Sequence, residues 1–260
     1  FGLITDAKLV PDPELIINRF AAEFEKLLLI ALMEDWNTDI TPADAEATLR
    51  RFVATQGATL TLTSGSILNV GGNNTISVPR LNLGAQGYAA IAAGTSLTIN
   101  SVITGTGGFV KDLPGTLILS APTNLAGVAN LSGYLLTGNF AINNGTVKLN
   151  GGNNTLTPNQ FLIVAPGATL DLNGTSQFAF GTRGDGAALQ GNAGTFTNSA
   201  AGAAALILGL DNGGFNFGGV IKQEVGAGAL SFLKSSNQQY NFLNANTYSG
   251  ATVFAGGLNL

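Results

Sequence analysis

The sequence predicts a mainly β protein, a parallel β-helix (solenoid) preceded by a small α-helical segment. Three observations support this: short alternating strands separated by Gly and Asn, the return of similar strands at a regular interval, and a change of composition near residue 51. The 260 residues are enough for one large domain or two ordinary ones. Hydrophobic residues make up 45% of the chain, so a substantial core can be buried.

The first predicted region, residues 1–51, is acidic and patterned as helix. Residues 1–50 hold ten of the fifteen acidic residues, and Gly2 is their only glycine. Apolar residues at spacings of three and four would share one helical face: Ile17, Phe20, Phe24, Leu27, Leu28, Leu32 and Trp36. A second short helix would begin near Thr41 as N-cap, with Pro42 next. We expect this segment to cap the open end of the solenoid, or to dock another subunit.

A calcium-like pattern lies within this segment. Its members have the ligand spacing of an EF-hand loop: Asp35, Asn37, Asp39, Thr41 and Glu46. The sixth position, which should be Gly for a sharp turn, is Ile40. An acidic linker between two helices is therefore the favoured interpretation, and no metal site is predicted.

The second predicted region, residues 52–260, is the repeat domain. Aliphatic and polar residues alternate in short segments, as expected for strands with one buried face, at 58–63, 96–100, 115–120, 145–151 and 168–174. Val147 and Leu149 return as Leu170 and Leu172, 23 residues later, which suits one turn of a β-helix. At 20–23 residues a turn, about 200 residues predict about nine or ten turns stacked about 4.8 Å apart. Inward aliphatic residues and turn Asn residues would then form ladders.

A β-sandwich is the alternative fold. The Asn-Gly dipeptides at 144–145 and 173–174 are of the type found in two-residue hairpins. Recurrence at the length of a turn favours the solenoid instead. A longer internal match aligns residues 111–127 with 234–250 and places Leu117 opposite Tyr240, both preceded by similar apolar pairs.

Within the repeat region the residues resemble a known family repeat. The segments ITGTGGFVK at 103–111, GTLILS at 115–120 and NANTYSGATVFAGGLNL at 244–260 are similar to the autotransporter-associated β-strand repeat, GxGGLxKxGxGTLxLSGxNTYxGxTxVxxGxLxL. Gln238-Gln239 departs from it where Gly-Thr is usual. The resemblance implies a right-handed β-helix, export to the bacterial outer membrane and surface, and a structural or adhesive role. Because the pattern stops midway at Leu260, we expect truncation there.

Composition excludes several kinds of chemistry. The chain has no Cys and no His, which removes disulfides, thiolate metal sites and Ser–His or Cys–His catalysis. Charged residues make up 10%, against about 25% in typical globular domains. The net charge of −4 argues against nucleic acid or an anionic membrane as partner.

Acidic residues in the repeat region are too scattered to predict an active site. There are five: Asp112, Asp171, Asp185, Asp211 and Glu224. Only Asp185 and Asp211 are separated by about one turn, and Arg183 could complete a site with Asp185, although a loop ion pair is simpler. Asp171 is expected to point outward from its strand. No catalytic, cofactor-binding or metal-binding residues are predicted.

The sequence therefore predicts a non-enzymatic extracellular protein of the bacterial surface: a passenger rod, adhesin or filament subunit. Its expected partners are other surface proteins or copies of itself, joined end to end or through the helical segment, with glycans as further candidates. No cofactor, nucleic-acid partner or transmembrane segment is expected. The alternatives are a carbohydrate-active β-helix enzyme and a carbohydrate-binding module. Paired aromatics at Phe178, Phe180, Phe215 and Phe217 are expected in the core rather than on a sugar-binding surface.

Overall fold

The structure of the chain is a computed structural model. It describes residues 59–121, 136, 138–156, 160–183, 193–209, 215–236, 239–255 and 258–259. The predicted helical segment 1–51, with its EF-hand-like spacing, lies outside the described residues. Asp185 and Asp211 also lie outside them, so the enzyme alternative that depends on them stays untested.

The described residues form strands and turns, with no helix. Sheet A contains β1 (Thr59–Leu62), β4 (Arg80–Leu83) and β7 (Val102–Gly105). Sheet B contains β2 (Ser66–Asn69), β5 (Gly87–Ile91), β8 (Phe109–Asp112), β10 (Phe140–Ile142), β12 (Phe161–Val164) and β15 (Gly181–Arg183). Sheet C contains β3 (Asn73–Ile76), β6 (Ser96–Ile99), β9 (Thr116–Leu119), β11 (Thr146–Leu149), β13 (Thr169–Asp171), β16 (Thr195–Asn198) and β19 (Val220–Gln223).

Two further sheets form the later part of the domain. Sheet D contains β14 (Ser176–Ala179), β17 (Ala204–Leu208), β20 (Leu230–Lys234) and β22 (Thr252–Phe254). Sheet E contains β18 (Phe215–Phe217), β21 (Tyr240–Phe242) and β23 (Leu258–Asn259). The chain visits sheets A, B and C in turn through β9. From β12 to β20 it visits B or E, then C, then D, and β21 of sheet E is followed directly by β22 of sheet D.

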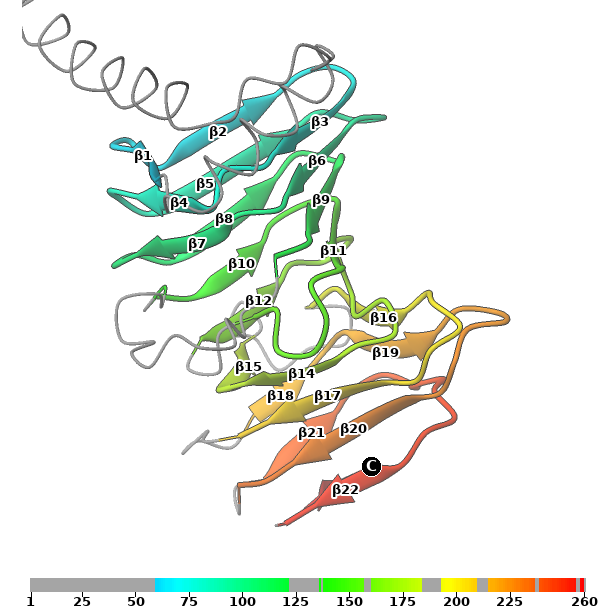
Figure 1. Cartoon of the computed structure of the whole chain (residues 1–260). Coiled ribbons are helices and arrows are strands. Elements are labelled where there is room, and N and C mark those ends of the chain that lie inside the picture. Colours follow the sequence, from blue (N-terminus) through cyan, green and yellow to red (C-terminus); the bar gives the residue numbers. More distant parts are fainter. Residues whose placement is uncertain are drawn as a thin grey trace, which may run out of the picture. The chain divides into compact units, whose positions relative to one another are not determined.

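Each strand pairs in parallel with the corresponding strand of the next turn, so the domain is a parallel β-solenoid (Figure 1). Val147 pairs with Leu170, which confirms the predicted shift of 23 residues. Every pairing among the described strands is parallel, and the β-sandwich alternative is therefore wrong. The Asn-Gly dipeptide at 144–145 does not close a hairpin but forms the corner between β10 and β11.

The predicted number of turns was too high. Sheet C has one strand per turn and seven strands, so the solenoid has about seven turns. Some strands of sheet C recur after 20 or 23 residues, as predicted, whereas others recur after 25, 26 or 30 because extra chain lies between them. Thr116 of β9 pairs with Thr146 of β11, thirty residues later.

The core consists of side-chain ladders along the inward faces of the sheets. In sheet C one ladder is made of buried residues paired turn to turn: Leu97, Leu117, Val147, Leu170, Phe196 and Ile221. Burial of each such side chain contributes about 1.5–3 kcal/mol to folding. Toward the later turns the core becomes aromatic, with Phe196, Phe217 and Tyr240 in successive ring contacts.

A second ladder, of polar side chains, follows the corner after sheet C. Asn100 donates from Nδ2 to Ser77 Oγ at 3.1 Å, and Asn173 donates to Asn150 Oδ1 at 3.2 Å. Asn150 in turn donates to Ser120 Oγ at 3.4 Å. The expected stacking of turn Asn residues is confirmed for Asn150 and Asn173, whereas serine is the partner at the other two contacts.

The two halves of the longer internal match lie on different sheets. Leu117 belongs to sheet C and Tyr240 to sheet E, and both are buried. The match therefore reflects a shared pattern of inward residues, which occurs in strands of two different sheets.

Candidate functional site

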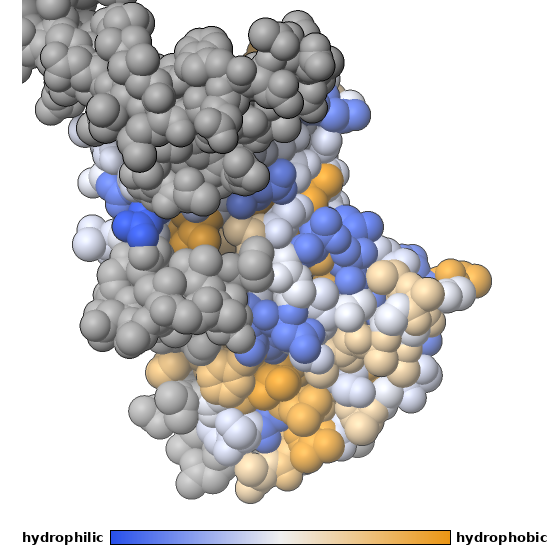
Figure 2. Space-filling model, in the orientation of Figure 1, coloured by the Kyte–Doolittle hydropathy of each residue, from blue (hydrophilic) through white to orange (hydrophobic). Residues whose placement is uncertain are grey.

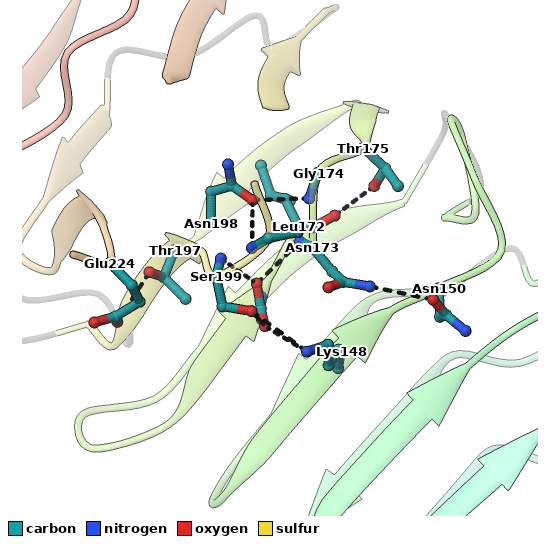
Figure 3. A network of polar contacts seen from close by, with 12 residues as sticks. Lys148, Asn150, Leu172, Asn173, Gly174, Thr175, Thr197, Asn198, Ser199 and Glu224 are labelled. Carbon is teal, nitrogen blue, oxygen red and sulfur yellow. Dashed lines mark hydrogen bonds and ion pairs between the residues drawn. The ribbon is translucent and has the colours of Figure 1, made fainter. Parts of the chain in front are cut away.

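A polar network lies on the outer side of sheet C and at the corner that follows (Figure 3). Its centre is Asp171. Because side chains along β13 alternate between the two faces of the sheet, Asp171 points outward, as predicted. The carboxylate is nevertheless buried, because Ser199 of the next turn covers it. Asp171 Oδ1 accepts from the backbone nitrogens of Asn173 at 2.9 Å and Ser199 at 3.1 Å, and Oδ2 accepts from Ser199 Oγ. Lys148 of the preceding turn places Nζ 3.7 Å from Oδ2.

Asn198 is the inward-facing polar residue of this network. It occupies the ladder position that Leu119 and Leu149 fill in earlier turns, is paired with Gln223 on the next turn, and is fully buried. Its Oδ1 accepts from the backbone nitrogen of Gly174 at 2.7 Å, and its Nδ2 donates to the carbonyls of Gly202 and Gly228 at 2.8 Å each. One side chain thus binds the backbone of three successive turns, which satisfies its own buried amide.

Glu224 continues the network on the next turn. Its Oε1 lies 3.0 Å from Lys222 Nζ and accepts from Thr197 Oγ1 at 3.2 Å. The hydrogen bond from Lys222 holds the pKa of this exposed carboxyl below its usual range. Lys148, Asp171, Thr197 and Lys222 are paired in register along the outer face of sheet C.

This arrangement favours cross-linking of turns over acid–base chemistry. A general acid needs a carboxyl whose pKa is raised and which can reach a substrate. Asp171 is enclosed by donors of its own chain, and Glu224 has a lowered pKa. Asp112 is similarly paired, since Tyr88 Oη donates to it at 2.7 Å and this bond lowers its pKa. No group of three acidic residues gathers within the described part of the chain.

Two buried lysines were missed by the sequence analysis. Lys111 has no exposed surface, and its Nζ donates to the carbonyls of Asp112 at 3.1 Å, Leu113 at 2.6 Å and Asn144 at 2.9 Å. Burial lowers the pKa of Lys111 to about 8. Lys234 is also buried and donates to the carbonyl and hydroxyl of Ser236 at 2.8 Å.

The alternation of inward and outward residues along the strands already indicated that these two lysines face inward. Both follow an apolar residue by two positions, in Phe109-Val110-Lys111 and Phe232-Leu233-Lys234, and residues two apart on a strand share a face. An inward ammonium is tolerated at the end of a strand because the carbonyls of the following turn are within its reach. These lysines therefore hydrogen-bond the corner groups of their own chain.

Sheet D carries an apolar outer column. Phe178, Ile207, Leu233 and Val253 are paired turn to turn and face outward, and Val253 is 50% exposed. Figure 2 shows hydrophobic side chains gathered in the lower part of the view, where β17 and β20 lie in Figure 1. The expectation that the paired aromatic residues lie in the core is confirmed for Phe217, which is buried. It is wrong for Phe178, which is half-buried on the outer face. The side chain of Phe215 lies outside the described part.

One depression near the last described turn combines aromatic and amide groups. It has a volume of roughly 350 Å³ and is lined by Phe242, Asn244, Ala245, Asn246, Tyr248, Gly250 and Thr252. Tyr248 Oη and Thr252 Oγ1 are hydrogen-bonded at 2.7 Å. The lining is uncharged, so a neutral polar molecule fits its chemistry better than an ion.

The fold defines a parallel β-solenoid protein. No protein-family model, curated protein or solved structure matches the chain. None of the described residues forms a helix with the length and hydrophobicity that crossing a membrane requires.

Proposed function

We propose that this chain is a non-catalytic extracellular structural protein of the bacterial surface, an autotransporter-type passenger rod, adhesin or filament subunit. The observation that carries the proposal is the use of the described acidic side chains. Asp112, Asp171 and Glu224 are each bonded to donors of the same or a neighbouring turn. Acidic side chains that are already bonded within the solenoid suit a stiff structural protein better than an active site.

The repeat-like segments add to this proposal. Residues 103–111 and 115–120 contribute β8 and β9 and the turns around them. A right-handed coil, export to the surface and association with surface proteins or further copies of the chain belong to the same proposal. Parallel strand edges support end-to-end association, because an unpaired edge can be extended by another chain.

Cell-surface labelling and polysaccharide assays test the proposal together. Antibodies against the chain should bind intact cells of its source, and the purified chain should release no new reducing ends from neutral or acidic polysaccharides. Labelling that requires permeabilised cells would overturn the surface location. Turnover that disappears in Asp185→Ala or Asp211→Ala would establish the enzyme alternative instead.

A second candidate function is carbohydrate binding without catalysis. The uncharged depression with Phe242 and Tyr248 favours it, because aromatic faces and amides suit sugars. A glycan array should then show binding that Tyr248→Ala abolishes. Tyr88→Ala is the matched control, since Tyr88 lies on the outer face of sheet B. Equal loss in both variants, or no binding by the wild-type chain, would remove this candidate.

A further inference from the structure

The corner at Asn144 and Gly145 differs from the other described Asn-Gly corners. The backbone nitrogen of Gly145 donates to Oδ1 of the adjacent Asn144 side chain at 2.7 Å. This is its only acceptor among the described residues. Because Cγ is bonded to Oδ1 at about 1.2 Å, the nitrogen lies within about 4 Å of the carboxamide carbon.

We propose that Asn144 is a site of spontaneous covalent modification, at which the Gly145 nitrogen cyclises onto the Asn144 side chain. Hydroxide removes the amide proton of Gly145, and the nitrogen attacks Cγ. The new N–Cγ bond forms while the Cγ–Nδ2 bond breaks, and Nδ2 leaves as ammonia. Water then opens the five-membered succinimide at either carbonyl, which gives aspartate or isoaspartate at position 144.

The surroundings of Asn144 leave this reaction unobstructed. Its side chain is exposed, so hydroxide and water reach it, and Nδ2 has no hydrogen-bond partner among the described residues. Gly145 has no Cβ to hinder the attack. Proximity of the two reacting groups makes the ring closure effectively unimolecular.

Asn173 and Gly174 form a matched pair in which the same reaction is blocked. The Gly174 nitrogen donates to Oδ1 of buried Asn198 at 2.7 Å, away from its own neighbour. The Asn173 amide donates from Nδ2 to Asn150 at 3.2 Å, and the Asn173 nitrogen donates to Asp171 at 2.9 Å. Cyclisation would require the two bonds to neighbouring turns, with Asn198 and Asn150, to open first.

Asn150, which precedes Gly151, is intermediate. Its Nδ2 donates to Ser120 Oγ at 3.4 Å and its Oδ1 accepts from Asn173. The amide is thus held between two turns. The structure therefore orders the three sites, with Asn144 fastest, Asn150 slower and Asn173 slowest.

The product would alter the corner that Lys111 stabilises. The Asn144 carbonyl accepts from Lys111 Nζ at 2.9 Å. Aspartate adds a carboxylate close to this ammonium, whereas isoaspartate lengthens the main chain by one carbon at the carbonyl that Lys111 binds. The two products therefore have different consequences for a corner stacked between neighbouring turns.

Peptide mapping of the aged chain tests the proposal. The native protein is incubated in mildly alkaline buffer, quenched in acid and digested with trypsin, and deamidation is followed by mass spectrometry. Residues 112–148 carry Asn144, and residues 149–183 carry Asn150 and Asn173, which fragmentation separates. The urea-unfolded chain is the reference, because each site then reacts with its intrinsic rate.

Relative to that reference, Asn144 should react within a few-fold of its unfolded rate. Asn173 should be at least about tenfold slower than its own unfolded rate, because its bonds must open first. Asn144→Gln should remove the signal from the first peptide without changing the second. Protection of Asn144 equal to that of Asn173, or faster reaction at Asn173, would overturn the proposal.

Discussion

The buried ammonium of Lys111 makes a sharp prediction about stability at alkaline pH. Its Nζ is enclosed and bound by three carbonyls, and burial lowers its pKa from 10.5 to about 8. In the unfolded chain the ordinary value applies. Between these values the unfolded chain holds a proton that the folded chain has released, so unfolding takes up a proton.

The sign follows from this proton uptake: the free energy of unfolding should rise as the pH increases from about 8 toward 10.5. One pKa unit corresponds to about 1.4 kcal/mol. The full interval would give roughly 3 kcal/mol, and we expect about 2 kcal/mol because solvent next to exposed Leu113 and Asn144 weakens the desolvation. The protonated ammonium of Lys111 thus gives a lower free energy of unfolding than the neutral amine does.

Urea unfolding followed by far-ultraviolet circular dichroism measures this effect. Lys111→Met should lose the rise, because the buried ammonium that titrates over this interval is gone. Lys222→Met is the matched control and should keep it, since Lys222 is partly exposed beside Glu224. A rise of equal size in Lys111→Met, or a wild-type stability that falls over this interval, would refute the reasoning.

Three further variants probe the inter-turn contacts, each by urea unfolding. Asp171→Ala should cost about 3 kcal/mol, because the donors of Ser199 lose a charged acceptor; a loss below about 0.5 kcal/mol would contradict this. Leu170→Ala should cost about 2–5 kcal/mol through a core cavity; a near-neutral result would place Leu170 outside the core. Gly194→Ala should cost at least about 3 kcal/mol, since its Cβ would lie 2.3 Å from the Ala168 carbonyl oxygen. Gly209→Ala is the control: the atoms nearest to its Cβ belong to the half-buried Phe178 ring and not to the backbone, so equal losses in both variants would contradict the account.

Much of the fold followed from two local signals. Alternation identified the inward residues of β9, β11 and β13, because side chains of a strand alternate between faces. The return of Val147 as Leu170 identified the partner strand, because a solenoid stacks equivalent residues. Both signals are local in the sequence and need no knowledge of the corners.

The corners were less predictable. Extra chain between strands lengthens a turn without changing the pattern of the strands, so the number of turns was overestimated. Replacement of sheet A by sheet D also leaves alternation intact, because strands of both sheets alternate buried and half-buried residues. Asn198 was missed because its backbone partners lie on neighbouring turns, which one sequence does not show. Alternation does mark Lys111 as inward, but the carbonyl partner at Asn144 that makes an inward ammonium tolerable is visible only in the structure.

The central claim is the parallel stacking of successive turns, and disulfide trapping tests it directly. The chain has no cysteine, so a pair can be introduced without background. Thr146 and Thr169 are paired on neighbouring turns, whereas Thr195 lies one turn further. Cα atoms about 4.8 Å apart can form a disulfide, and those about 10 Å apart cannot. Thr146→Cys with Thr169→Cys should therefore cross-link under mild oxidation, and Thr146→Cys with Thr195→Cys should not. Cross-linking of the second pair without the first would contradict the account.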